Sequence, residues 1–423
     1  MFQQNGLSLD QAPPIGVVFR LFFTASIFGI LAAILILFYG TTIFDPSSIG
    51  AITLTHTLTL GVMASFMLGS LFQMLPVIAG VVVTSPTKKS LLVQIPFIVG
   101  TILLLLAFNL SYPILYTIAS ILLALSLFGV VGMMVYRLLK VSNHSASSKG
   151  MVLSLLSFGI TIAFAIYLIS TLSGYIDGEY YLQAKTLHYH FGLFGWVTLL
   201  IFSISFQVIE MFYVTPPYPA MVSKYLVPSI FALLIVAMPL ELIYPQISIS
   251  VAILFSLLMI YFALLTLYRL SQRKRPLADA TMWFWRLGLG SLIVSMLLAI
   301  LYLYLPNSYI STISTISFVS FALSIVFAMF YKIVPFLTWF HLNAQGYYKA
   351  PMMHEVIHPK RAKKHFWIHL SMIILLLLSL IGRDFIYLAG IATMISFGWI
   401  SYHIVYAHLL YKKIVASGEK FDF

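Results

Sequence analysis

Long apolar runs separated by short polar stretches recur along the whole of this 423-residue chain. They lie near residues 15-40, 50-80, 91-108, 112-137, 151-173, 188-214, 226-244, 247-270, 283-305, 310-340, 366-382 and 386-411. A helix of about 20 apolar residues crosses a hydrocarbon core of ~30 Å, and its backbone N–H and C=O groups form hydrogen bonds within the helix. The pattern therefore predicts an all-α integral membrane protein with about twelve transmembrane helices, forming a single transmembrane helical domain over residues 1-423.

Composition leads to the same class. Hydrophobic residues make up 61% of the chain and charged residues only 8%, which is too little polar surface to cover a soluble globule. The polar segment before the first run lacks the basic start and small-residue cleavage site of a signal peptide. The chain has no cysteine, which excludes disulfides, thiolate metal clusters and thiol nucleophiles. We expect a multi-pass protein of the inner (cytoplasmic) membrane, in contact with the lipid bilayer.

Basic residues gather in alternate loops. The clusters at 87-89, 136-140, 273-275, 359-364 and 411-413 all follow even-numbered predicted helices. Cytoplasmic loops carry the excess of lysine and arginine, so both termini are predicted to be cytoplasmic. Residues 341-365 then form a cytoplasmic basic loop between the tenth and eleventh helices. The formal charge of +12 is thus explained by the basic residues of the predicted cytoplasmic loops, and no nucleic-acid partner is expected.

Three histidines lie near the outer ends of two predicted helices. His56 is in the helix over 50-80, and His188 and His190 open the helix over 188-214. An imidazole within a bilayer is costly unless it has a partner, so such a residue is a candidate functional site. The predicted topology places all three at a similar depth.

The two helices also resemble each other in sequence. Gly61 follows His56 at the offset at which Gly195 follows His190, and the pairs at 72-73 and 206-207 (Phe-Gln) also match. A fainter third copy ends the helix over 310-340, where Thr315 takes the place of the histidine. The pattern indicates an internal repeat of roughly four helices and a pseudo-threefold arrangement.

These features resemble the haem-copper oxidase subunit I superfamily, in particular its C-type oxidase branch and the related NnrS-type membrane proteins. The resemblance covers the chain in topology and the helices over 50-80 and 188-214 in sequence. It implies haem held by histidines within the bundle. His56 matches the histidine that ligates the low-spin haem, His188 or His190 matches the copper ligand, and Arg383 occupies the place of arginines that pair with haem propionates.

The chain departs from that family at two sets of ligands. The helix over 310-340 has no histidine pair for the haems, and the helix over 226-244 lacks the adjacent histidines of the copper site. Imidazoles remain good axial ligands for haem iron. Positions i and i+2 of a helix point about 200° apart, so His188 and His190 should not ligate one metal together. The repeat favours His56 with His190 as a bis-histidine pair, which leaves His188 for a second haem, a copper ion or a hydrogen bond.

Two simpler interpretations stand beside this one. A histidine within a membrane can form only an interhelical hydrogen bond, and Gly61 and Gly195 can serve only close helix packing. Residues 354-358 read HEVIH, in which two histidines one helical turn apart can bind zinc for a protease. Pro351 and Pro359 bracket this string closely, which favours a solvated, basic, membrane-hugging loop instead.

Two classes of function fit the sequence. The first is a b-type haem protein with one or two haems and optional copper, concerned with redox chemistry or with nitric oxide or oxygen. Its electron partner would be quinol or an outer-face carrier, and its status as an oxidoreductase is open. The second is a proton- or metal-coupled transporter or channel that uses the same histidines. No paired Pro/Gly-broken helices typical of transporter sites are present, which favours the first class.

Overall fold

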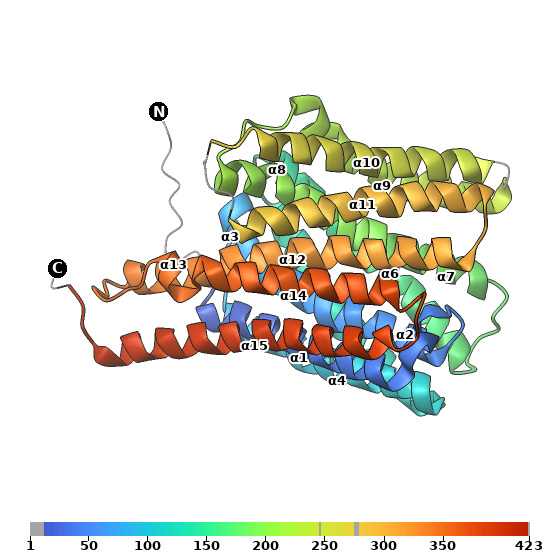
Figure 1. The fold of residues 1–423 in the computed structure, drawn as a ribbon, viewed down its shortest axis with the longest axis horizontal. Coiled ribbons are helices and arrows are strands. Elements are labelled where there is room, and N and C mark those ends of the chain that lie inside the picture. The colour runs from blue at the N-terminus through green and yellow to red at the C-terminus, as the bar shows by residue number, and fades with distance from the viewer. Residues whose placement is uncertain (1–11, 245–246, 275–278, 422–423) are drawn as a thin grey trace. The chain divides into compact units, whose positions relative to one another are not determined.

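The structure, a computed structural model, describes residues 12–244, 247–274 and 279–421. Within them the chain is helical, and no strand is formed. The elements are α1 (Ile15–Tyr39), the 3₁₀ turn η1 (Gly40–Phe44), α2 (Ile49–His56), η2 (Thr57–Ala64), α3 (Ser65–Ala79), α4 (Pro86–Leu110), α5 (Pro113–Leu139), α6 (Ala146–Leu172), α7 (Tyr181–Tyr189), η3 (His190–Thr198), α8 (Leu199–Tyr213), α9 (Ala220–Ile243), α10 (Ser248–Ser271), α11 (Ala280–Tyr304), α12 (Ser308–Ala344), α13 (Met353–Val356), α14 (Pro359–Leu378) and α15 (Phe385–Ser417) (Figure 1).

The predicted class of protein is confirmed. Ten helices of the described residues are long and apolar enough to cross a membrane. Two further predicted spans correspond to α9, whose described apolar part is Ala220–Val236, and to α14, which begins with a basic turn. The protein is therefore an all-α, multi-span membrane protein. The pseudo-threefold arrangement and the side of the membrane on which the termini lie stay predictions.

Several helices begin earlier than the hydrophobic pattern predicts, and two of these starts affect candidate residues. α7 adds helical residues before His188, so this histidine lies within a helix and not at its first turn. α14 begins at Pro359 rather than at 366, because proline is preset for the first helical position and the His358 side chain accepts a hydrogen bond from the Lys360 amide. The basic residues of the predicted loop 341-365 thus partly belong to a helix, where lysine and arginine stems can cover apolar surface.

The helices form two compact units. The first contains the described residues of Met1–Leu91, Ala278–Trp285 and Ser324–Phe423. Its frame is the pair α1 and α15, in which Ser401 donates a hydrogen bond to Ser26 over 2.8 Å and the rings of Phe19 and His408 lie 6.3 Å apart. These contacts make the pair antiparallel, so α1 begins at the end of the unit at which α15 finishes (Figure 1).

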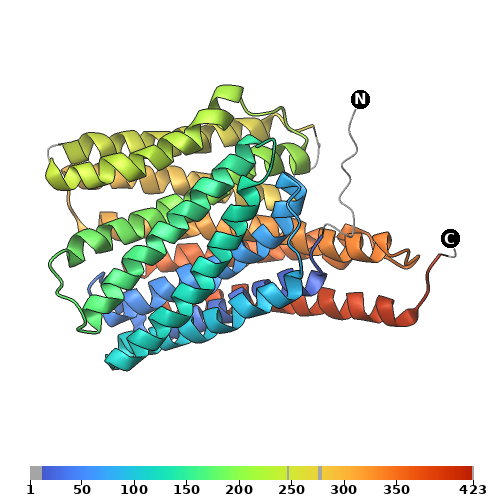
Figure 2. The same cartoon turned by 180° about the vertical axis from the view of Figure 1, so that it is seen from behind.

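The second unit contains Leu92–Leu277 and Arg286–Leu323, and α6 is its central helix. α6 lies beside α5, as Figure 2 shows, and it also packs on η3 and α8. The rings of Phe158 on α6 and Trp196 on η3 are stacked at 4.4 Å. This packing fixes the position of η3, which begins at His190.

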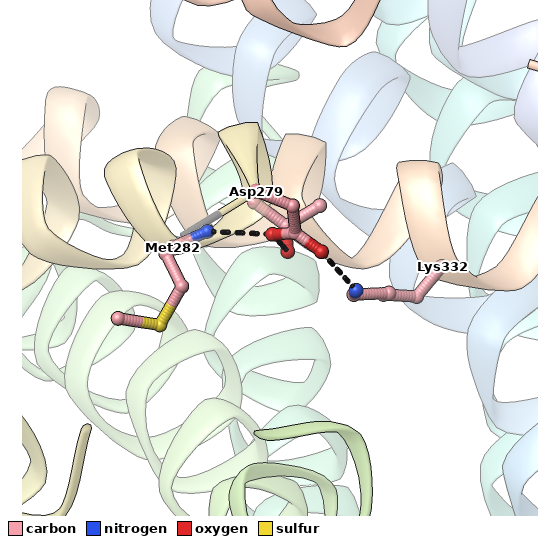
Figure 3. A network of polar contacts seen from close by, with 4 residues as sticks. Asp279, Met282 and Lys332 are labelled. Carbon is pink, nitrogen blue, oxygen red and sulfur yellow. Dashed lines mark hydrogen bonds and ion pairs between the residues drawn. The ribbon is translucent and has the colours of Figure 1, made fainter. Parts of the chain in front are cut away.

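An ion pair marks the start of α11 in the first unit. Lys332 Nζ lies 2.6 Å from Asp279 Oδ2, and the other carboxylate oxygen accepts hydrogen bonds from Thr281 Oγ1 and the Met282 amide (Figure 3). Burial raises the pKa of the Asp279 carboxyl, but Lys332 and the two hydrogen-bond donors outweigh burial and hold the pKa below its usual value. Asp279 thus caps the helix and pairs with a mostly buried lysine.

We expect Asp279→Ala to destabilise the protein by about 1 kcal/mol or more, because the cap is lost and Lys332 loses this carboxylate. Asp279→Asn keeps a capping oxygen, so at neutral pH it should lower the stability less than Asp279→Ala does. The pKa of the Asp279 carboxyl is lower in the folded protein than in the unfolded chain. Its contribution to the free energy of unfolding is therefore present above the unfolded-state pKa and is lost as the pH falls through the folded-state pKa. Thermal unfolding in detergent at several pH values measures both effects, and equal midpoints for all three proteins would contradict the assignment.

Candidate functional site

Two helical segments, one in each unit, share an unusual local structure. In the first, α2 ends at His56 and is followed by the π-helix η2 and then by α3. In the second, α7 is followed by the π-helix η3, which begins at His190, and then by α8. The π-helices contain 8 and 9 residues, and α3 and α8 contain 15 each. π-Helical turns are rare and frequently occur at functional sites. Their matching positions beside both histidines support the internal repeat.

His56 and His190 are held in the same way. His56 Nδ1 lies 2.9 Å from the carbonyl oxygen of Ile52, and His190 Nδ1 lies 2.8 Å from that of Thr186. Both partners are four residues earlier in the chain. A carbonyl oxygen only accepts hydrogen bonds, so each Nδ1 carries the proton, and in the neutral ring the lone pair is on Nε2. A backbone carbonyl that fixes the tautomer in this way is typical of histidines that ligate metals.

His188 makes a different contact. Its Nδ1 donates to the carbonyl oxygen of Thr161 on α6 over 3.0 Å, so it joins α7 to a neighbouring helix rather than to its own backbone. Of the roles that the sequence left open for His188, the hydrogen bond is present. The local geometry of His190, and not that of His188, repeats that of His56.

Aromatic side chains surround His190 within the second unit. Its ring centroid lies 5.8 Å from that of Phe194, which is 5.0 Å from Phe255 and 5.3 Å from Phe318. Phe194 thus places an apolar ring beside an imidazole that is itself half-buried. A neutral, apolar-walled histidine is suited to ligation of a hydrophobic cofactor.

The two repeat glycines serve close packing. A Cβ atom on Gly61 would lie 2.5 Å from Phe28 Cγ, and one on Gly195 would lie 2.6 Å from Ser157 Cβ. The faces of these glycines are thus covered by protein side chains, which leaves no place for a macrocycle against them. The packing role that the sequence allowed for both residues is the one observed.

The third copy of the repeat lacks the special local structure. α12 is α-helical throughout, and Thr315, at the place of the histidine, is exposed and donates to the carbonyl oxygen of Ser311. No metal ligand was expected at this position, and the Thr315 hydroxyl forms its hydrogen bond within α12.

Arg383 lies in the short connection between α14 and α15 and is exposed. Because α1 and α15 are antiparallel, this connection is at the end of the first unit where α1 finishes and the chain turns toward α2. Arg383 thus lies in a short connection between two helices, and both its location on the outer face and its role toward haem propionates stay predictions.

The HEVIH string does not form a protease-type zinc motif. His354 is on α13, which ends at Val356, and Ile357 is extended with φ −132°. His358 lies beyond this break as the cap of α14. The two histidines therefore do not share the face of one helix, which the motif requires.

We accordingly expect His354→Ala to leave cofactor content and folding unchanged, because the side chain is exposed and its string is not assembled as a site. Bound haem per protein and the elution volume in size-exclusion chromatography measure this. Loss of cofactor in this variant would show that the loop, and not the π-helical segments, carries the site.

Among the residues that the structure describes, no three histidine, aspartate or glutamate side chains gather as a site for a metal ion. The copper ion implied by the resemblance therefore has no support from such a group. Axial ligation of haem needs only one or two imidazoles, so it does not depend on such a group.

The sequence reasoning missed a buried histidine cluster in the first unit. His365 and His369 on α14 and His403 on α15 are all 0% exposed. His365 is the last residue of the predicted loop 341-365, and His369 lies in the first turn of the predicted span 366-382, next to a basic stretch. Only the extension of α14 back to Pro359 places them inside the protein.

Comparison with models of known protein families found no match, and no curated protein matches this sequence.

Proposed function

We propose that this protein is a b-type haem-binding membrane protein of redox or diatomic-gas function, similar in plan to the haem-copper oxidase subunit I superfamily. His56 and His190 are the proposed axial ligands. The observation that carries the proposal is the matched pair of π-helical segments, each with a histidine at its head whose Nδ1 is bonded to the carbonyl four residues earlier.

The donor chemistry fits haem. A neutral imidazole with its lone pair on Nε2 is the form that ligates haem iron, and the backbone bond at Nδ1 orients the ring and raises its basicity. When bound, haem supplies one-electron and gas-ligand chemistry. The chain's part is to hold the iron by imidazole, to orient the ring and to surround it with apolar side chains, of which Phe194 lies beside His190.

The remaining assignments follow from the same plan. Arg383 is proposed to pair with propionates at the outer face, and His188 to position α7 through Thr161 rather than to bind metal. Electrons would come from quinol or an outer-face carrier. α9 has no histidine in its sequence and α12 has only His341, in its last turn, so the family's histidine pairs are missing and no oxygen-reducing copper centre is proposed.

The test is an absorption spectrum of the protein purified in detergent, oxidised and then reduced with dithionite, with a pyridine haemochrome assay for haem type and amount. We expect b-type haem in stoichiometric amount with a sharp reduced band. A folded protein that is reproducibly colourless, even when expressed with added haem precursor, would reject the proposal and favour a transporter that uses the histidines for protons or metal ions.

A further inference from the structure

One exposed face of α14 changes from basic to apolar along its length. Lys360, Lys363 and Lys364 are exposed near its start, Trp367 is 52% exposed one turn further on, and Ile374 is exposed beyond it. Residues three, four or seven positions apart lie on the same side of a helix, so these side chains share a face. The face thus offers cations, then an aromatic ring, then aliphatic surface.

Two basic residues at the start of α14 lie over aromatic rings of neighbouring helices. Lys363 Nζ is 4.9 Å from the ring centroid of Trp283 on α11, and Arg361 Cζ is 5.4 Å from that of Tyr406 on α15. The Trp283 ring also lies 6.0 Å from that of Trp367. A cation is attracted to the face of an aromatic ring, so these contacts hold both charged side chains beside the exposed face of α14.

The basic cluster of α14 consists of Lys360, Arg361, Lys363 and Lys364. Among the described residues, no carboxylate forms an ion pair with any of its side chains. The acidic residue closest in sequence is Glu355, whose carboxylate accepts a hydrogen bond from the Met352 amide over 2.7 Å. The cluster therefore creates a positive potential that attracts an anion.

α15 lies beside α14 and shows the same order of surfaces (Figure 1). The contact of Arg361 with Tyr406 and the hydrogen bond of His365 with Ser396 make the two helices antiparallel. Tyr402, which is 54% exposed, therefore lies toward the basic end, and exposed isoleucines of α15 lie further along. Exposed Trp and Tyr rings next to Lys and Arg are typical of the membrane–water interface, whereas aliphatic side chains face the acyl chains.

An anionic phospholipid has the same order of groups. Its phosphodiester carries the negative charge, and its acyl chains extend from the headgroup into the apolar layer. A soluble anion would leave Trp367 and Ile374 uncovered, and a zwitterionic lipid would bring a further cation toward the basic cluster. Charge and apolar surface together favour the anionic lipid.

We propose that the exposed face at the start of α14 binds an anionic phospholipid. Lys360 and Lys364 donate charge-assisted hydrogen bonds to its phosphate, and Trp367 and Ile374 lie against an acyl chain. The two cations held over aromatic rings add positive potential at the same level. Binding of this lipid does not depend on bound haem.

Native mass spectrometry of the whole chain, titrated in detergent with phosphatidylglycerol or with phosphatidylcholine of the same acyl chains, measures the binding. We expect phosphatidylglycerol to bind more tightly. Each basic residue near a membrane surface strengthens binding of anionic lipid by about fivefold, so Lys360→Ala/Lys364→Ala should weaken binding of phosphatidylglycerol by roughly 25-fold. Binding of phosphatidylcholine should not change. Both side chains are exposed, so the variant should fold.

A second pair of lysines controls for net charge. Lys88 and Lys149 are exposed near the starts of α4 and α6, and among the described residues neither contacts an aromatic ring. Lys88→Ala/Lys149→Ala removes the same charge and should leave the affinity for phosphatidylglycerol within about twofold of that of the unsubstituted protein, because exposed charges at a distance are screened.

Trp367→Ala and added inorganic phosphate distinguish a lipid from a soluble anion. Loss of the indole should weaken binding of phosphatidylglycerol, and inorganic phosphate should not displace the lipid. The proposal is overturned if phosphatidylcholine binds equally well, if both lysine pairs lower the affinity equally, if Trp367→Ala has no effect, or if inorganic phosphate displaces the lipid.

Discussion

Replacement of His56 or His190 by glycine is expected to lower the amount of bound haem by roughly tenfold or more, because an axial ligand is lost. Removal of a residue that only hydrogen-bonds to a metal ligand already lowers metal affinity by about tenfold or more, and loss of the ligand itself should have at least that effect. Both side chains start π-helical segments in the same geometry, so both losses should be similar in kind. Haem per protein and the shape of the reduced band measure the effect.

Rescue by imidazole separates ligation from folding. Free imidazole fits the space left by His56→Gly or His190→Gly and should restore a low-spin spectrum if the variants are folded. His188→Gly is the matched control, since its ring is bonded to the Thr161 carbonyl and is not a proposed ligand. Full retention of haem in both ligand variants, with loss only in His188→Gly, would transfer the assignment to His188.

Replacement of Gly61 or Gly195 by alanine is expected to destabilise the fold by about 1–3 kcal/mol, and leucine at either place should prevent folding. The added Cβ would lie 2.5 Å from the Phe28 ring or 2.6 Å from Ser157 Cβ, so a neighbouring helix has to move. The shift falls within the π-helices η2 and η3 and should also disturb the histidines. Thermal unfolding and the yield of monodisperse protein measure it.

The control is Gly129→Ala on α5, where an added Cβ meets no atom within 4 Å. Alanine is the better helix former, so this variant should be neutral or slightly more stable. Combining Gly61→Ala with Phe28→Ala should recover part of the lost stability, because the obstructing ring is removed. If Gly61→Ala behaves like Gly129→Ala, close packing at η2 is not as described.

The hydrophobic pattern alone predicted the class of fold and the position of nearly every span, since burial in lipid demands long apolar helices. It also aligned His56 with His190, and the shared hydrogen-bond geometry agrees with that alignment. The π-helices were not predicted, because a widened turn keeps the same apolar composition as an α-helix and changes only which carbonyl each amide reaches.

The early start of α14 and the burial of its two histidines could not be predicted for a different reason. Lys360 to Lys364 read as a cytoplasmic loop, although a helix with snorkelling lysines has the same sequence. His365 and His369 were therefore placed at the edge of the membrane, and their serine partners on α12 and α15 are contacts between distant residues that no local pattern reveals.

Near-infrared magnetic circular dichroism of the oxidised protein shows whether His56 and His190 ligate haem iron, because the position of its charge-transfer band identifies the axial ligands of low-spin haem. We expect a bis-imidazole band that disappears in both His56→Gly and His190→Gly. A band typical of histidine–methionine or purely high-spin haem, or a protein that binds no haem at all, would contradict it.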